Sequence, residues 1–591
     1  MNLPSIVDKL LSDTLETSLP LFRPELVLCA TIVLMLLVRV FRGGQYLPSF
    51  LIALGGSLTA LWMALPKEGL ASWSGMESQE LFTGMLVYDS LTAYIRVFLL
   101  VFSVLFVILS QLTGIADRED GQDYFTLVLG ATLGMCVMAS ANHMLAVFLG
   151  IEMASVPSYV LAGIVKGRSR SSEAALKYAI YGAGTAGVML YGISLLCGVL
   201  GTAHLPSMAV ELAALDIPAM IASGENGRTL MVLALGGLMM GVGLAFKLSA
   251  VPFHFWCPDV FEGASAEVDG FLSVASKAAA LALLLRVGFG LGYLADDPQD
   301  NIAAAKGPVA MASISTMAST MSSTMNRQFS GTQSQLAKLQ LAQVQLDGGN
   351  WGAGATSASP LSPVRRFFVI LVAIAAMITC TFGNLAAYGQ TNIKRMLAYS
   401  TIAHAGFMMM AAAAAVGLVG QNREHAESAV SALLLYLAIY LFMNLSAFAI
   451  IAFLRNAMQS EEIKDYAGLI RSCPMVAVMM TAVLVSLIGL PPLAGFWPKL
   501  RVLQSLYQAG GPLMTIVLIV AALNTAIALV YYLRVAKTIC IDDEPDSRGP
   551  VSLGFLPAAY VLVVSAPVVL LGILPEEIAQ WASQAARQLF S

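Results

Sequence analysis

The chain has 591 residues, of which 58% are hydrophobic and 12% charged, and its formal net charge is −4. A soluble globular chain carries roughly a quarter charged residues, so this composition excludes an ordinary soluble protein and indicates a membrane protein. The small net charge leaves no broad basic surface, and nucleic acid is therefore not an expected partner.

The N-terminal segment contains Asp8, Asp13 and Glu16 and lacks a basic start followed by an apolar core. We therefore expect no cleaved signal peptide. From Leu26 to Leu571, apolar runs of roughly 20 residues recur, each long enough to cross a bilayer, and we count about fourteen of them. The sequence predicts an all-α membrane protein whose helices share one bundle in the lipid bilayer.

Lysine and arginine are concentrated in alternate loops, and such loops stay on the cytoplasmic side of a membrane. This bias predicts a multi-pass protein of the bacterial inner membrane with both termini in the periplasm. The basic loops contain Arg39 and Arg42; Lys166, Arg168 and Arg170; Lys394 and Arg395; Arg455, Lys464 and Arg471; and Arg534 and Lys537.

Two ionisable residues lie within apolar spans of the first half, Glu152 and Lys277. An ionisable side chain at mid-membrane costs about 2.5 to 3.5 kcal/mol on insertion scales, so its presence indicates a partner or a hydrated path. Lys177 follows a basic loop, where a side chain reaching towards the head groups is nearly as good an explanation. The segment Gly182-Ala-Gly-Thr-Ala-Gly187 matches a dinucleotide fingerprint but has no preceding strand. We interpret it, like Gly237 and Gly241, as close helix packing.

Two apolar segments are interrupted by proline, at Pro252 and at Pro491-Pro492. We interpret both as broken helices. They lie about 240 residues apart, and paired broken helices in two halves of a transporter are the best sequence indication of an ion path. Each break carries a lysine, Lys247 or Lys499, and the alternative for both is a side chain that reaches the head groups. Lysines beside a paired glutamate can load and release protons when the pairing distance changes.

His404 lies in an apolar segment of the second half and could relay a proton near neutral pH, although a buried hydrogen-bonded histidine is the ordinary alternative. The loop with His254, Cys257, Asp259 and Glu262 contains metal-ligand residue types, but their spacing matches no known site, and we interpret it as a structural turn. None of the seven cysteines forms a C-x-x-C or clustered spacing. We expect no metal site and no redox centre in this chain.

The composition changes from Asp296 to Pro363 to Ala, Ser, Thr, Met, Gln and Gly, which is typical of an inserted low-complexity loop. The C-terminal tail places Ile578, Trp581 and Ala585 on one helical stripe, as in an interfacial helix. We predict an N-terminal segment (1–24), a first membrane bundle (25–295), the inserted loop (296–364), a second membrane bundle (365–575) and a C-terminal interfacial helix (576–591).

These stretches resemble the antiporter-like membrane subunits of bacterial NADH:quinone oxidoreductase, respiratory complex I, and among them the N-type subunit. The most specific matches are the segments Phe255–Ala264, Ser273–Ala279, Gln390–Gly406 and Gly489–Phe496. The chain departs from the family pattern after Gly263, where the family usually has Ala-Pro-Thr or Ala-Thr-Pro and this chain has Ala264-Ser-Ala-Glu-Val-Asp269, which includes Glu267. The long insertion is also unusual for the family.

The resemblance implies about 14 transmembrane helices with two inverted five-helix repeats, and proton pumping coupled to quinone reduction elsewhere in an enzyme complex. It implies that Glu152 pairs with Lys247, that Lys277 is the central lysine and that Lys499 lies near the outward exit, with Lys177 and His404 as accessory residues. NADH, FMN, iron–sulfur clusters and quinone would belong to partner subunits, and the neighbours would be other antiporter-like and small membrane subunits. Two alternatives remain: a sodium/proton antiporter subunit without a redox partner, and a structural subunit that moves no protons.

Overall fold

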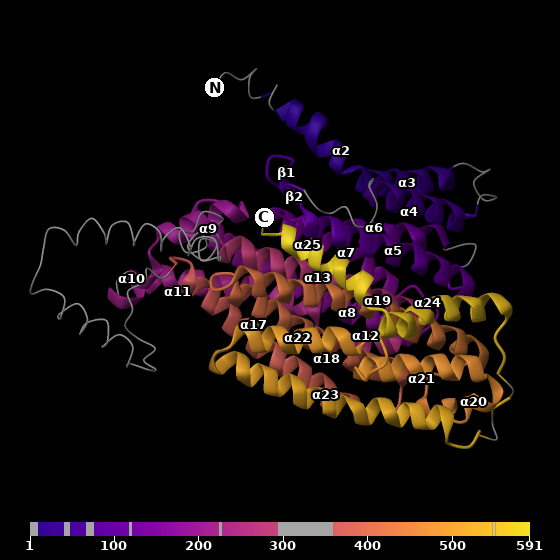
Figure 1. Ribbon diagram of the computed structural model, residues 1–591. Helices are drawn as coiled ribbons and strands as arrows, with labels where there is room; N and C mark the ends of the chain where they lie inside the picture. The colour runs from indigo at the N-terminus through magenta and orange to yellow at the C-terminus, as the bar shows by residue number, and fades with distance from the viewer. Residues whose placement is uncertain are drawn as a thin grey trace, which may run out of the picture.

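The computed structural model describes Val7 and residues 10–40, 48–66, 76–116, 121–223, 227–293, 359–545, 548–549 and 551–590. The expected insertion at 296–364 therefore lies almost entirely outside the described residues. Within them the chain is predominantly helical, as the apolar runs predict, and the long helices run side by side (Figure 1).

The first half of the chain forms a series of helices and one small hairpin. In chain order these are η1 (Asp13–Ser18), α2 (Leu19–Leu21), α3 (Arg23–Val40), α4 (Ser49–Ala64), β1 (Gln79–Leu81), β2 (Leu86–Tyr88), α5 (Ser90–Thr113), α6 (Gly121–Ser140), α7 (Met144–Ala162), α8 (Ser169–Leu200), α9 (Leu205–Ala214), α10 (Ile217–Ser223), α11 (Gly227–Leu248), α12 (Trp256–Gly263) and α13 (Ala266–Gly292). The two strands are antiparallel, with Glu80 opposite Val87.

The second half is helical throughout its described residues. Its elements are α17 (Ser362–Ala387), α18 (Ile393–Leu418), α19 (Arg423–Met458), η3 (Ile463–Tyr466), α20 (Leu469–Ser472), α21 (Pro474–Ile488), α22 (Phe496–Ala509), α23 (Gly511–Cys540), α24 (Phe555–Ile573) and α25 (Glu576–Gln588).

Eleven of the described helices are long and apolar enough to cross a membrane. The count becomes up to twelve if the pair Leu10–Leu21 and Arg23–Arg39, bent by 81°, is one span. The helices that end at the two predicted breaks differ in length. The helix α11 is long enough to count as a membrane span, whereas α21 is shorter. The sequence count of about fourteen is therefore higher than the number of full-length spans in the described part of the chain.

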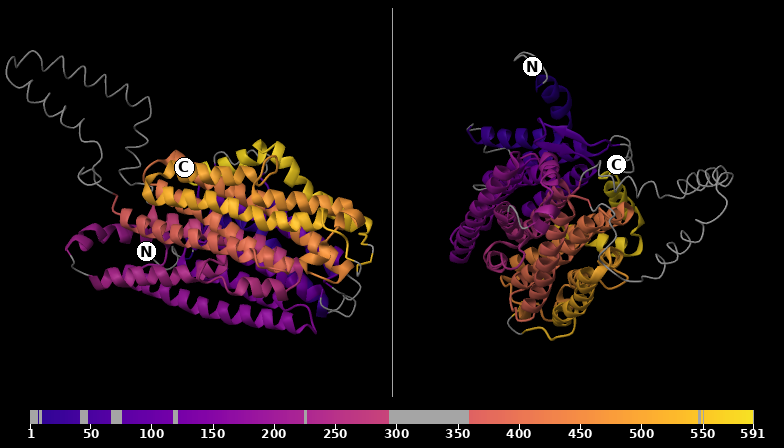
Figure 2. Two further views of the ribbon diagram at one scale, coloured as in Figure 1. Left: turned by 90° about the horizontal axis from the view of Figure 1, so that it is seen from below. Right: turned by 90° about the vertical axis from the view of Figure 1, so that its left-hand side faces the viewer.

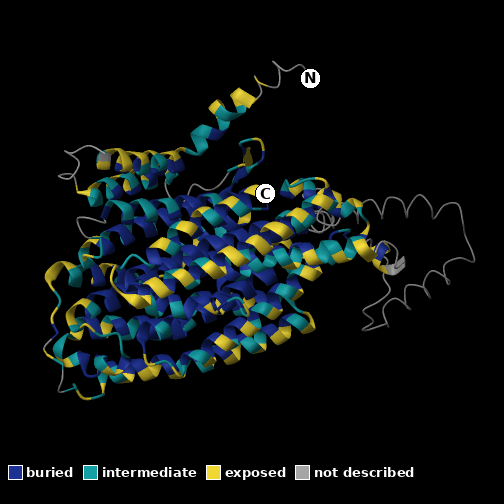
Figure 3. Ribbon diagram, turned by 180° about the vertical axis from the view of Figure 1, so that it is seen from behind, coloured by how far each residue is buried: buried dark blue, intermediate teal, exposed yellow. Residues whose placement is uncertain are grey.

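Three helices, α13, α18 and α19, form the centre of the bundle. The apolar stretch of α13 is entirely buried and those of α18 and α19 almost entirely, whereas α8, α11 and α23 are mostly uncovered. Figure 3 shows this as a dark blue interior with exposed residues towards the periphery. Runs of alanine in α18, from Ala411 to Ala415, are fully buried and permit close approach of neighbouring helices.

The two ends of the bundle differ in charge. At one end Arg395 of α18 forms ion pairs with Asp259 and Glu262 of α12, and Arg39 pairs with Asp123. We call this end the basic face, because the basic loops with described residues, those near Arg39, Arg168, Lys394, Lys464 and Arg534, lie there.

At the opposite end η1 contacts the hairpin, where the Thr83 amide donates to Asp13. The C-terminal helix α25 also ends there, with Phe590 packed against Phe289 and Tyr293. The described ends of the chain therefore lie at the same end of the bundle. Figure 2 shows the N-terminal helices on one side of the bundle and the C-terminal half on the other.

The glycine pattern at 182–187 reflects close packing only in part. A Cβ at Gly182 would lie 2.0 Å from the Tyr159 hydroxyl, whereas Gly184 and Gly187 have nothing within 4 Å. Gly237 and Gly241 line an apolar cavity rather than a tight helix contact, since their nearest neighbours are side-chain atoms of Phe367 at 3.5 Å and of the α17 residue Leu371 at 3.9 Å. Close packing was therefore the right interpretation for Gly182 and the wrong one for Gly237 and Gly241.

Candidate functional site: a buried row of lysines

The first helix break supplies hydrogen-bond acceptors for a buried lysine. The helix α11 ends at Leu248, Ser249 adopts a left-handed conformation (φ 55°), and α12 begins at Trp256. A helix that stops leaves its last carbonyl groups without partners. The Lys277 ammonium group, reaching across from α13, donates to the Leu248 carbonyl at 2.9 Å and to the Ser249 hydroxyl at 2.5 Å.

Lys277 is 1% exposed, and its charge also lies 5.7 Å from the centre of the Trp256 ring. That ring is fixed in turn, because the Trp256 indole donates to the Phe246 carbonyl at 3.1 Å and stacks on Tyr178. The prediction that Lys277 lies inside the membrane bundle is confirmed by this burial. Its hydrogen bonds exclude a side chain that reaches the head groups.

Lys247 precedes the same break and is 2% exposed. Its ammonium nitrogen has no hydrogen-bond partner among the described residues. Glu152, on α7, is half-buried, and the structure contains no ion pair between the two side chains, although both are described. Only their longer-range attraction remains. The expected contact between Glu152 and Lys247 is therefore not formed in this conformation.

The second break repeats the arrangement of the first, except that its lysine comes from the helix that follows the break. The helix α21 ends at Ile488, and Lys499 of α22 donates to the carbonyls of Leu487 at 3.0 Å and Ile488 at 2.8 Å. Lys499 is 5% exposed and lies 4.9 Å from the centre of the Phe407 ring. Both breaks thus hold a buried ammonium group on freed carbonyls. The residue that does this at the first break is Lys277, not Lys247.

Gly489 makes the second arrangement possible. It has φ 90°, a conformation that favours glycine, and a Cβ at this position would lie 2.7 Å from the Lys499 Cδ. The break residues also include cis peptide bonds before Pro252 and before Pro492.

A hydrogen-bonded cluster of aromatic residues and His404 lies beside Lys499. His404 is 3% exposed, and its ring nitrogens lie 2.8 Å from the Tyr436 hydroxyl and 3.2 Å from the Tyr532 hydroxyl. The Tyr532 hydroxyl also bonds to Ser400. His404 is therefore a buried, hydrogen-bonded histidine within the electrostatic range of Lys499.

The sequence interpretation missed the polar stripe on α19 that faces this cluster. Tyr436, Tyr440 and Asn444 recur every four residues within an apolar helix, so they share one face. All three are buried, and the Tyr440 hydroxyl and the Asn444 amide have no hydrogen-bond partner among the described residues. Their spacing in an otherwise apolar run was the signal that could have identified them. The helix α19 contacts both α13 and α22, and Tyr436 and Tyr440 lie beside the His404 ring.

Lys177 lies apart from the other lysines, at the basic face. Its side chain is 37% exposed and bonds to Asp259 and Glu173, both at 2.8 Å. Asp259 and Glu262 also bind Arg395. Both acidic residues belong to the helix α12, so the interpretation of this stretch as a structural turn was wrong: it is a short helix that ion pairs join to α8 and α18. The residues that the sequence singled out as possible metal ligands here serve this ion network and the packing of His254 on Phe382.

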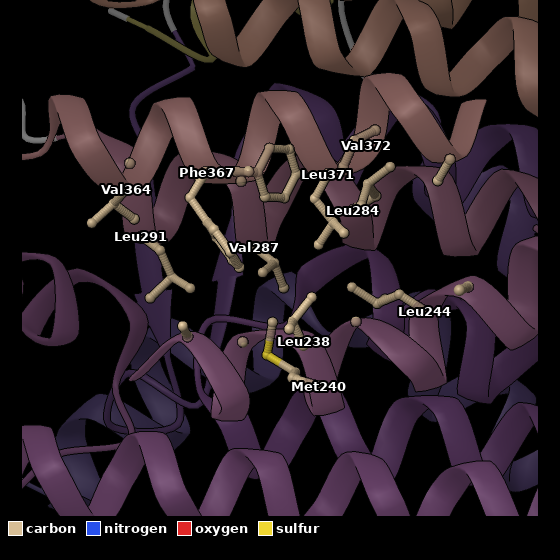
Figure 4. A pocket seen from close by; sticks show the side chains of 18 of the residues that line it. Leu238, Met240, Leu244, Leu284, Val287, Leu291, Val364, Phe367, Leu371 and Val372 are labelled. Atoms are coloured by element: carbon tan, nitrogen blue, oxygen red, sulfur yellow. The ribbon is translucent and has the colours of Figure 1, made fainter. Parts of the chain in front are cut away.

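An apolar cavity of about 680 Å³ lies between α11, α13 and α17. Figure 4 shows side chains of all three helices pointing into it, among them Leu244, Leu284 and Phe367. Arg365 is the one charged residue in its lining. A cavity so lined offers no relay of polar groups, so we place the candidate site at the lysines and not here.

Comparison with known proteins shows the family of this chain. The family described as NADH:quinone oxidoreductase/Mrp antiporter, transmembrane, matches residues 141–324 and 354–525, more than half of the chain. This chain belongs to that family. The match includes both helix breaks, Lys277, Lys499 and His404.

Named relatives of this antiporter family extend the match to nearly the whole chain. NADH-quinone oxidoreductase subunit N of Anaeromyxobacter sp. strain Fw109-5 is 33% identical over 588 residues, covering 96% of each chain. Subunit N 2 of Sorangium cellulosum strain So ce56 is 34% identical over 569 residues, covering 94% of this chain and 95% of that protein.

Solved structures share the fold. A chain of respiratory complex I from Thermus thermophilus with bound Aureothin has a TM-score of 0.64 and 26% identity, covering 94% of this chain and 98% of that one. A chain of the Mrp complex from Dietzia sp. DQ12-45-1b has a TM-score of 0.67 at 15% identity, covering 97% of this chain and 98% of that one. The second likeness concerns the fold alone.

Proposed function

We propose that this chain is the proton-translocating N subunit of an NADH:quinone oxidoreductase and that Glu152, Lys247, Lys277 and Lys499 carry the protons. The observation that carries this proposal is the placement of Lys277 and Lys499, each buried at a helix break with its ammonium group on freed carbonyls. Structural membrane helices rarely retain such costly groups, whereas proton-moving ones require them.

The chemistry follows from the acceptors. A carbonyl oxygen only accepts hydrogen bonds, so the carbonyls of Leu248 and Ile488 stabilise the ammonium form of the lysine that donates to them. Release of the proton requires that the ammonium group be drawn away from these carbonyls or that a neighbouring charge change. In the first half Lys247 supplies such a charge, because it precedes the same break and repels a protonated Lys277.

Glu152 is proposed as the switch for Lys247. In the described conformation the two side chains are not paired, and Glu152 lies on a helix whose outer face exposes Met153 and Val156. A neighbouring membrane subunit that packs on this face could move α7 and close the distance. Loading of Lys247 would then favour release from Lys277 by repulsion.

The second half is proposed to carry the proton onward. The polar stripe of α19 and His404 connect the surroundings of Lys277 with those of Lys499. We further propose that the two halves are inverted five-helix repeats, each with one break, within the family's fourteen helices. Lys177 would be an accessory group at the basic face, where it bonds to Asp259.

We propose that the basic face is cytoplasmic, which places both termini in the periplasm of a bacterial inner membrane. The positive loops gathered at that face support this orientation. Labelling of single cysteines introduced at Lys464 and at Thr83, in the hairpin at the opposite end, would test it. Reaction of Lys464→Cys from the periplasmic side only would reverse the assignment.

NADH, FMN, iron–sulfur clusters and quinone are assigned to partner subunits, and this chain would contribute to the enzyme as a translocase subunit. The alternatives, an antiporter subunit without a redox partner and a subunit that moves no protons, differ in a measurable way. Co-purification of the chain with an NADH-oxidising complex would exclude the antiporter subunit without a redox partner. Loss of pumping after substitution of its lysines would exclude the subunit that moves no protons.

The decisive substitution is Lys277→Arg. An arginine keeps the charge and can still donate to Leu248, but it does not release a proton in a protein. Proton pumping into vesicles and coupled quinone reduction should both be lost while the complex still assembles, as judged by native gel electrophoresis. Normal pumping in Lys277→Arg and in Lys499→Arg would overturn the proposed function.

A further inference from the structure

Two carboxyl groups that the mechanism above does not use lie fully buried at the start of α13. Glu267 and Asp269 occupy its first turn, and both are 0% exposed. Ser265 caps this helix by accepting from the Val268 amide. The positive end of the helix dipole favours acidic residues here, which explains why they are tolerated but not what they bind.

Asp269 connects to the basic face through Lys394. The Lys394 ammonium group lies 3.8 Å from Asp269 and 3.0 Å from Glu461, and it donates to the Ala264 carbonyl at 2.6 Å. The Glu461 side chain is 17% exposed, so this group of charges reaches the surface. Arg455, at the end of α19, contributes a further positive charge near Asp269.

Glu267 faces the other side of α13. Neither of its oxygens has a hydrogen-bond partner among the described residues, and the same holds for the Asp269 oxygens. The Tyr124 hydroxyl, which bonds to Ser110 at 2.9 Å, lies within electrostatic range of Glu267. Water molecules are the usual partners of buried polar atoms that protein groups leave unsatisfied, so these carboxyl groups indicate a hydrated space inside the bundle.

Polar residues of α13 continue from Asp269 towards Lys277. Asp269, Ser273 and Lys277 are four residues apart, so they form one stripe on α13 that rises about 12 Å. Ser273 is fully buried. The helix α19 packs against α13 and presents the buried Asn444 amide and the Tyr440 hydroxyl of its own stripe. Polar groups thus accompany the whole distance from the first turn of α13 to the central lysine.

We propose that Glu267 and Asp269 form the proton-uptake site of this subunit, which receives protons at the basic face and passes them through water to Lys277. In each step a proton leaves surface water and protonates a carboxylate, and it then moves along water held by Ser273 and Asn444 to the Lys277 amine. This assignment rests on the proposed function. It gives a role to the two residues at which the sequence departs from the family pattern.

The test uses the assembled complex in vesicles and compares Asp269→Asn, Glu267→Gln and their combination with the wild type. Proton delivery by a positioned acid is worth about a hundredfold or more, so the double variant should lose at least tenfold in pumping and in coupled quinone reduction. Proton uptake should then limit turnover, and the solvent isotope effect in D₂O should rise above that of the wild type. Asp269→Glu keeps a carboxyl group at this position and should therefore retain the turnover that Asp269→Asn loses.

A matched control is Asp89→Asn. Asp89 is a buried carboxylate that pairs with Arg286 at the opposite end of α13, off the proposed route. Its replacement should reduce the amount of assembled complex but leave the isotope effect per complex unchanged. A double variant that behaves like this control, or one with wild-type turnover, would overturn the uptake site. The proposed function would stand in that case if Lys277→Arg still abolished pumping, and it would fail if Lys277→Arg pumped normally.

Discussion

The ammonium group of Lys277, on α13, is hydrogen-bonded to the carbonyl of Leu248, the last residue of α11. A charge carried by one helix therefore completes the end of another. A displacement of the α11 end changes the hydrogen bonds of Lys277 directly, without any intervening side chain. Lys499 and Ile488 have the same relationship at the second break.

Gly489→Ala should displace Lys499. The added Cβ would lie 2.7 Å from the lysine Cδ, and φ 90° would add strain of about 1 kcal/mol. Gly201→Ala is the matched control, because Gly201 also ends a helix with positive φ (69°) but has nothing within 4 Å. Both variants should lose a similar amount of thermal stability, measured on the purified complex. Only Gly489→Ala should lose proton pumping, and equal pumping by the two variants would contradict the role of Lys499.

Glu152→Gln should lower proton pumping together with coupled quinone reduction, because it removes the negative charge that favours a protonated Lys247. Lys247→Ala should have a similar effect. The double variant should lose less than the sum of the two single losses, since it leaves no uncompensated charge. Pumping and quinone reduction in vesicles measure all three. Strictly additive losses would mean that the two residues do not act as a pair.

Tyr532→Phe should slow transfer between the two halves. Its hydroxyl bonds to Ser400 and lies 3.2 Å from His404, so the substitution interrupts the cluster while it preserves the packing of the ring. We expect turnover to fall about tenfold with assembly unchanged. Tyr94→Phe, which removes another buried tyrosine hydroxyl that donates to the Leu434 carbonyl at 3.1 Å, serves as the comparison. Equal effects of the two substitutions would argue against a relay through His404.

Deletion of residues 313–354 should leave assembly and pumping largely intact. This prediction rests on composition, because low-complexity segments tolerate change better than packed helices. Native gel electrophoresis and vesicle pumping would measure it. Loss of the assembled complex would assign the segment a structural role.

Patterns that depend on the membrane were predictable from the sequence. Apolar length predicted the helices, and the prolines at 252 and 491–492 predicted both breaks. The burial of Lys277 and Lys499 was predictable as well. A charge among apolar neighbours costs free energy, so a lysine at such a position indicates a buried site with partners for its charge.

Relations between helices were not predictable in the same way. The spacing of Lys247 and Pro252 suggested that Lys247 is the lysine of the first break, but the acceptors there are taken by Lys277, which arrives from the next helix. Whether Glu152 points towards Lys247 depends on how α7 is rotated about its own axis. Because α7 is largely apolar on all sides, its sequence pattern does not predict that rotation. The α19 stripe could have been identified, because Tyr436, Tyr440 and Asn444 repeat every four residues.

The Ser90 hydroxyl, at the start of α5, donates to the carbonyl of Ala585 in α25, and the two residues are 495 positions apart in the chain. At a synthesis rate of 5 to 20 residues per second, α5 is inserted roughly 25 to 100 s before its partner exists. During that interval the surface that α25 covers on α5 is open to other occupants. The order of synthesis thus creates a period in which a chaperone, a lipid or a protease can compete for a site that the finished protein closes.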